Sequence, residues 1–192
     1  MPAIRSTLLA FCVCALAMTP GFAAEDADHD HDHDHEHEHE EARGLDAHVH
    51  GHGVFNIAVE DGELHMELEA PGADIVGFEH APESEEDKAA VAAAMAKLND
   101  PLSLFIPSAA AGCALEEADV ELHVEEETGH SEFHAVYHID CADLAAVEAM
   151  AFPYFTEFPG AEELDVTVVS DKGQKAYEVE RDAPDLDLGG AI

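Results

Sequence analysis

Positively charged side chains are scarce in this sequence. Its 192 residues contain 7 Lys and Arg against 44 Asp and Glu, which gives a formal net charge of -37. Proteins that bind nucleic acid or anionic membranes without specificity need a positive face, so this balance excludes both kinds of partner. The excess of carboxylate favours cations, and it is also typical of proteins that stay soluble in high salt.

Motifs of common enzymes are absent as well. The sequence has neither a Gly-rich phosphate-binding loop nor a GxSxG nucleophile motif. Its carboxylates are so numerous that no pair stands out as a general acid and a general base. We therefore expect a protein that is not an enzyme.

Long apolar runs are missing too, apart from one at the N-terminus. The run Thr7–Met18 follows Arg5 and is too short to span a bilayer, which takes about 20 apolar residues. A Pro-Gly pair breaks the run, and two alanines shortly after it suit cleavage. These features predict a signal peptide over residues 1–24 and a soluble periplasmic protein without membrane insertion. A lipoprotein would instead be acylated at Cys12, but Phe11 stands where a small residue is needed.

Cysteine is rare, and half of it belongs to the signal peptide. Cys12 and Cys14 leave with that segment, so Cys113 and Cys141 remain. In an oxidising compartment we expect these two to form a disulfide. The alternative is a pair of thiolate metal ligands, which the lack of CxxC spacing disfavours.

Histidine is abundant, and the acidity of the chain does not account for it. The sequence contains 15 His, many of them in residues 28–40, the histidine tract, where they alternate with carboxylates. An extended chain has two polar faces here and can bury neither, so we expect residues 25–46 to be disordered. Imidazole binds Zn²⁺, Cu²⁺ and Ni²⁺, so the tract predicts capacity for divalent metals with little selectivity. Its histidines are His29, His31, His33, His35, His37 and His39.

Alternating runs after residue 47 predict strands. Asp61-Gly62 between two such runs is typical of a tight hairpin turn. Residues 85–98 have helical spacing, with Ser84 as the expected N-cap and Asp87 as its capping-box partner. The predicted hairpins pair residues 54–60 with 63–70, 118–125 with 132–141, and 164–170 with 175–180.

This order of elements favours an α+β fold. Three hairpins predict an antiparallel sheet with one solvated face and one main helix on the other face. We place a single metal-binding domain with one disulfide at residues 47–182. Residues 183–192 are expected to form a flexible acidic tail.

The second hairpin carries histidine and carboxylate on one face. If Phe133 and Tyr137 face the core, the residues between them face outward. Residues two apart on a strand lie roughly 6.6–7 Å apart, and ring nitrogens can converge on one Zn²⁺ from that spacing. His138 lies too far along the strand and needs another neighbour, from His48, His50, His52 or His65. A solvated, His-rich face is the alternative. The expected ligands here are His123, His130, Glu132, His134 and His138.

Four more histidines are candidate ligands. His48, His50 and His52 form an HxHxH pattern that leads into the first strand, and the glycines beside them allow close approach. His80 stands alone before Pro82, and a structural hydrogen bond is the alternative to metal binding there.

Several motifs resemble those of the ZrgA-type family, periplasmic auxiliary proteins of zinc uptake. They are AHVHGHG at 47–53, DIVGFEHAP at 74–82, HSEFHAVYHIDC at 130–141 and FPYFTEFPG at 152–160. The resemblance implies a soluble periplasmic protein that binds zinc and assists a zinc-importing ABC transporter and its periplasmic binding protein. Many relatives carry a second His/Asp tract before the HSEFH-like motif, where this chain has only EEETGHSE. The ligands that the resemblance implies are His48, His50, His80, His130, His134 and His138.

The sequence is compatible with three functions. The first is capture of Zn²⁺ for import, and the second is buffering or detoxification of zinc, copper or nickel without a transport partner. The third is an acidic surface protein whose histidines are incidental. Copper specialists often add Met clusters, and the methionines of the predicted domain are not clustered, which favours zinc. Exposed histidines on a strand can also join two copies of the chain through a bridging metal ion.

Overall fold

The computed structural model describes residues 49–60, 62–125 and 128–192. The predicted signal peptide, the histidine tract and His48 lie outside the described residues. Within these ranges, no helix combines the length and the apolar character that crossing a membrane requires.

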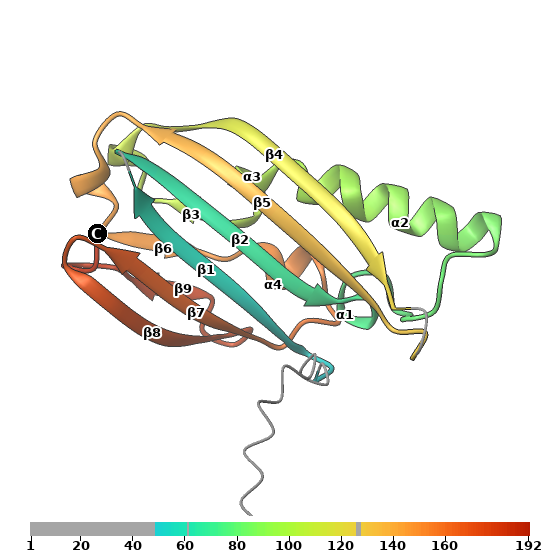
Figure 1. The fold of residues 1–192 in the computed structure, drawn as a ribbon. Coiled ribbons are helices and arrows are strands. Elements are labelled where there is room, and N and C mark those ends of the chain that lie inside the picture. The colour runs from blue at the N-terminus through green and yellow to red at the C-terminus, as the bar shows by residue number, and fades with distance from the viewer. Residues whose placement is uncertain (1–48, 61, 126–127) are drawn as a thin grey trace, which may run out of the picture. The chain divides into compact units, whose positions relative to one another are not determined.

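A six-stranded sheet is the main element of the fold (Figure 1). Its strands are β1 (His52–Glu60), β2 (Glu63–Pro71), β4 (Cys113–Val124), β5 (Ser131–Cys141), β7 (Glu163–Ser170) and β8 (Gly173–Glu180). Their order is β4-β5-β2-β1-β7-β8. The three predicted hairpins are antiparallel, but β1 and β7 pair in parallel. The sheet is therefore mixed, and the prediction of an antiparallel sheet is wrong at this junction.

Local sequence accounts for the hairpins and not for the way they join. Gly62 adopts a φ of 92°, a conformation that glycine reaches without strain. The two-residue turn sets the register of this hairpin, in which Phe55 pairs with Leu68 and Ile57 pairs with Met66. The parallel pairing sets β1 against a strand that is remote in the chain, and no turn motif signals such a contact.

Helices and a small sheet cover one face of the six-stranded sheet (Figure 1). The elements of this layer are α1 (Gly72–Val76), α2 (Glu85–Leu98), α3 (Pro101–Leu104), β3 (Ile106–Pro107), β6 (Ala149–Ala151), α4 (Tyr154–Glu157) and β9 (Asp185–Asp187). The predicted capping box of α2 is confirmed: the Ser84 hydroxyl accepts from the Asp87 N–H at 3.0 Å, and the Asp87 carboxylate accepts from the Ser84 N–H at 3.1 Å. Because the other helices are short, the fold is mostly β.

Aromatic rings join the two layers. The Phe105 ring, fully buried, stacks on that of Phe55 from β1 at 4.2 Å between centroids. It also contacts the rings of Phe152 and Tyr154. Burying a side chain of this size contributes roughly 1.5–3 kcal/mol, so this cluster anchors the helical layer to the sheet.

One disulfide ties the edge strand β4 to β5. Cys113 and Cys141 are direct cross-strand partners, with Cα atoms 3.9 Å apart. The predicted disulfide is therefore confirmed.

The C-terminal residues differ from the expected flexible tail. β9 pairs with β6, and Leu186, Leu188 and Ile192 are buried. Residues 183–192 are acidic on average, but their alternate leucines supply an apolar face that packs against the core. The expectation of a flexible tail is therefore corrected.

Candidate metal sites

The face of the six-stranded sheet opposite the helical layer carries histidines and carboxylates. Along β5 the buried residues alternate with partly exposed ones. The partly exposed set includes His134 and His138 from the strand itself. Since β5 lies between β2 and β4, the outward residues of both neighbours line the same surface.

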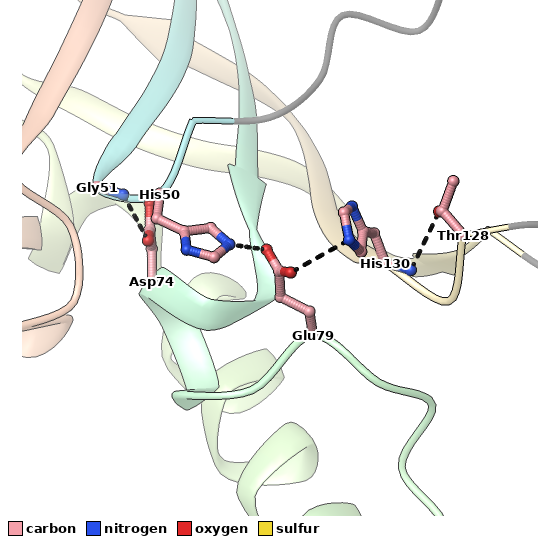
Figure 2. A network of polar contacts seen from close by, with 6 residues as sticks. All are labelled: His50, Gly51, Asp74, Glu79, Thr128 and His130. Carbon is pink, nitrogen blue, oxygen red and sulfur yellow. Dashed lines mark hydrogen bonds and ion pairs between the residues drawn. The ribbon is translucent and has the colours of Figure 1, made fainter.

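At one end of the sheet, two imidazoles converge on one carboxylate (Figure 2). His50 precedes β1, Glu79 follows α1, and His130 precedes β5. The His50 Nε2 lies 2.5 Å from Glu79 Oε1, and the His130 Nε2 lies 3.7 Å from Glu79 Oε2. The Glu79 side chain is only 17 % exposed, whereas both histidines are at least half exposed. We call these three residues the Glu79 site.

Helix α1 contacts the segments that carry His50 and His130. The Asp74 carboxylate is buried and accepts a hydrogen bond from the Gly51 N–H at 2.8 Å, which fixes the chain next to His50 (Figure 2). Gly72 packs so closely on Ser131 that a Cβ at this position would clash with the Ser131 hydroxyl. One helix thereby positions the segments on both sides of Glu79.

Burial of Asp74 has an electrostatic consequence. Desolvation raises the pKa of its carboxyl group, and the hydrogen bond from Gly51 opposes this effect. Among the described residues, the second oxygen of Asp74 has no hydrogen-bond partner. Asp74 therefore supports the turn at Gly51 at some cost in desolvation.

Two mixed clusters occupy the open face of the sheet. In one, the His134 Nε2 lies 2.7 Å from Glu67 Oε1, and Glu69 completes a group with ligand atoms within 4.8 Å of one another. The His123 ring lies 6.0 Å from the His134 ring. The members of the second cluster, which meet the same 4.8 Å limit, are Glu63, His65 and His138.

The structure distributes the sequence-predicted ligands over several places. His50 and His130 meet at Glu79, and His138 faces His65 across the strands. His52 lies 3.5 Å from a carboxylate oxygen of Glu163. Glu132 is the cross-strand partner of His123.

His80 is packed against its neighbours in the chain. Its ring stacks on Phe78 at 4.7 Å between centroids, and its Nδ1 lies 3.0 Å from the carbonyl oxygen of Ala81. Among the described residues, His80 belongs to none of the clusters whose atoms lie close enough to share a metal ion.

Sequence reasoning missed the carboxylates that complete these groups. Glu79 stands next to His80 in a motif that drew attention only to the histidine. Glu67 and Glu69 alternate with apolar residues in β2, but their link to His134 depends on the pairing of β2 with β5. That pairing joins two hairpins, and no local pattern predicts it.

Comparison with known proteins agrees with this chemistry. The model of the ZrgA family of zinc uptake proteins matches residues 47–188. No curated protein sequence matches the chain. The matched region includes the Glu79 site and both mixed clusters, which offer the imidazole and carboxylate ligands that zinc accepts. The chain therefore belongs to the ZrgA family of zinc uptake proteins.

Proposed function

We propose that this protein captures Zn²⁺ in the periplasm and assists its import by an ABC transporter and the periplasmic binding protein of that transporter. The observation that carries the proposal is the convergence of His50 and His130 on Glu79, in a chain of the zinc uptake family. Imidazole nitrogens bind Zn²⁺ at about 2.0–2.1 Å and carboxylate oxygens at about 2.0–2.2 Å. The ligand atoms of the Glu79 site are not all within 4.8 Å of one another, so the two exposed histidines have to rotate toward Glu79 to bind one ion.

The number of ligands suits a carrier. Three protein ligands leave a fourth position of a tetrahedral Zn²⁺ ion open. An acceptor protein can enter through that position, and both histidines are exposed enough for such contact. A closed site with four protein ligands would favour a permanent structural ion instead.

Binding at the Glu79 site is coupled to protons. An ionised carboxylate only accepts hydrogen bonds, so the His50 Nε2 carries a hydrogen when it contacts Glu79. Zn²⁺ must displace that hydrogen, because an imidazole nitrogen binds the metal only in its deprotonated form. We expect affinity to fall steeply as the solution becomes acidic.

A strain that lacks the gene tests the role in import. We expect a growth defect when a chelator limits zinc, and rescue by the wild-type gene. The double variant His50→Ala/His130→Ala should fail to rescue. His123→Ala, which removes an exposed histidine of β4 whose ring contacts Glu121 and not Glu79, is the control and should rescue.

The alternative is a periplasmic buffer for zinc, copper or nickel without a transport partner. The mixed clusters spread over the sheet favour this function, because several open sites bind more metal than one carrier needs. A deletion strain that grows normally without zinc but poorly in excess metal would support the buffer and contradict the import role.

A further inference from the structure

The cluster on β2 and β5 lies on two interior strands of the sheet. His65 and His138 are direct cross-strand partners, and their rings lie 4.6 Å apart with an interplanar angle of 79°. Glu63 Oε2 lies 3.7 Å from His65 Nε2. β2 and β5 each have a strand on both sides, so neither is free to move as an edge strand would be.

The ligand atoms of this cluster lie close enough together to approach one tetrahedral ion. Donor atoms around Zn²⁺ lie about 3.3 Å apart when the bonds are about 2.0–2.1 Å long. The ligand atoms of Glu63, His65 and His138 already lie within 4.8 Å of one another. Rotation of side chains closes that gap without movement of the strands. Glu117 lies opposite His138 on β4 and adds negative charge from the other side.

We propose that Glu63, His65 and His138 form a second Zn²⁺ site, separate from the Glu79 site and independent of its role in import. Roughly 26 Å of extended strand lie between His130 and His138, so one ion cannot use both. The second site joins β2 to β5, the only pair of strands that connects the first two hairpins within the described sheet. With three protein ligands and an open position, its zinc is exchangeable.

A zinc titration of the full mature protein, followed by NMR of the histidine rings, tests the proposal. We expect the ring signals of His65 and His138 to shift together, with a common midpoint. His65→Ala should abolish the shift of His138. Glu63→Gln should weaken binding at these rings at least tenfold, since even loss of a group that only supports a ligand costs about 10–100-fold.

Asp140→Asn is the matched control. Asp140 lies on the same strand as His138, is exposed, and carries the same charge as Glu63, but it belongs to none of the described clusters. Asp140→Asn should change the midpoint of the zinc titration far less than Glu63→Gln does. Equal effects of the two variants would overturn the proposal, because they would show general attraction by the acidic surface.

Two other results also contradict the site. One is a His138 shift that persists in His65→Ala, and the other is a titration in which neither ring responds. The amide spectrum of each variant shows whether it remains folded. The ring signals of His50 and His130 report on the Glu79 site in the same titration, so failure of one proposal is distinguishable from failure of the other.

Discussion

Gly72 sets the distance between α1 and the start of β5. Any side chain here would collide with Ser131 and would lie 2.8 Å from the Phe78 carbonyl oxygen. We expect Gly72→Ala to push His130 away from Glu79, to weaken zinc binding there, and to lower the free energy of unfolding by roughly 1–3 kcal/mol. Denaturant unfolding and zinc competition with a chelator measure the two effects.

Gly189→Ala is the control for this prediction. A Cβ at Gly189 would meet only the movable carboxylate of Asp187, at 3.0 Å. This variant should retain zinc binding and most of its stability. If Gly72→Ala binds zinc as tightly as Gly189→Ala does, α1 does not position the Glu79 site.

Asp74 gives the fold a pH dependence. Burial raises the pKa of its carboxyl group above the usual value of 3.8, so the folded state binds the proton more tightly than the unfolded state. The resulting stabilisation is complete below pH 3.8 and is lost as the pH rises through the raised pKa of the folded state. Relative to Asp74→Asn, the wild type should therefore lose stability as the pH rises over that window.

Denaturant unfolding of both proteins across a pH series gives the measurement. Asp74→Asn keeps an oxygen that accepts from Gly51, so it removes the titration and retains the hydrogen bond. A stability difference between wild type and variant that is flat with pH, or that changes in favour of the wild type, would contradict the assignment.

The sequence shows which histidines can bind metal better than it shows which residues form one site. The HxHxH and HSEFH patterns drew attention to His50 and His130, which the structure brings to one carboxylate. Glu79 was not predicted as a ligand, and His65 was only one of four possible neighbours of His138, because each gains its role from residues that the chain brings near it in space. A carboxylate among 44 acidic residues carries no signal of its own.

The disulfide is the element that secures an otherwise exposed edge strand. It closes a loop with a sequence separation of 28 residues at the end of β5 far from His130. We expect the double variant Cys113→Ala/Cys141→Ala to lose about 3 kcal/mol in free energy of unfolding, on the chain-entropy estimate. Zinc binding at the Glu79 site should persist.

Reductant provides the internal control for the disulfide. It should lower the stability of the wild type toward that of the double variant and leave the variant unchanged. Denaturant unfolding with and without reductant makes the comparison. If the variant unfolds at the same denaturant concentration as the oxidised wild type, the bond contributes nothing to stability.

Elements with a local cause were predictable, and elements with a remote cause were not. The β1–β2 register follows from one turn and one alternating pattern, and α2 begins where its capping box places it. The parallel contact of β1 with β7 and the packing of β9 on β6 depend on distant segments. A few leucines in an acidic stretch give too weak a pattern to predict β9.

The whole molecule combines a folded domain with a histidine tract. Deleting residues 28–40 should lower the number of Zn²⁺ ions bound per chain and leave the tightest site in place. The reason is that the tract supplies numerous similar ligands, whereas the Glu79 site holds its ligands in a folded structure. Equilibrium dialysis of the two chains measures both quantities.

Histidine-to-asparagine replacement throughout the tract is the control for deletion, because it preserves chain length. Both variants should give the same stoichiometry. Loss of the tightest site in either one would show that the tract, and not the folded domain, holds the most strongly bound ion.

The parallel pairing of β1 with β7 also determines when the sheet can be completed. His52 has to meet Glu163, so one side of β1 stays open until the chain has been made almost to its end. Contacts of such long range make folding slow, because the entropy of closing a large loop is lost before the contact stabilises anything. The six-stranded sheet of this protein can therefore take its final form only after β7 has been made.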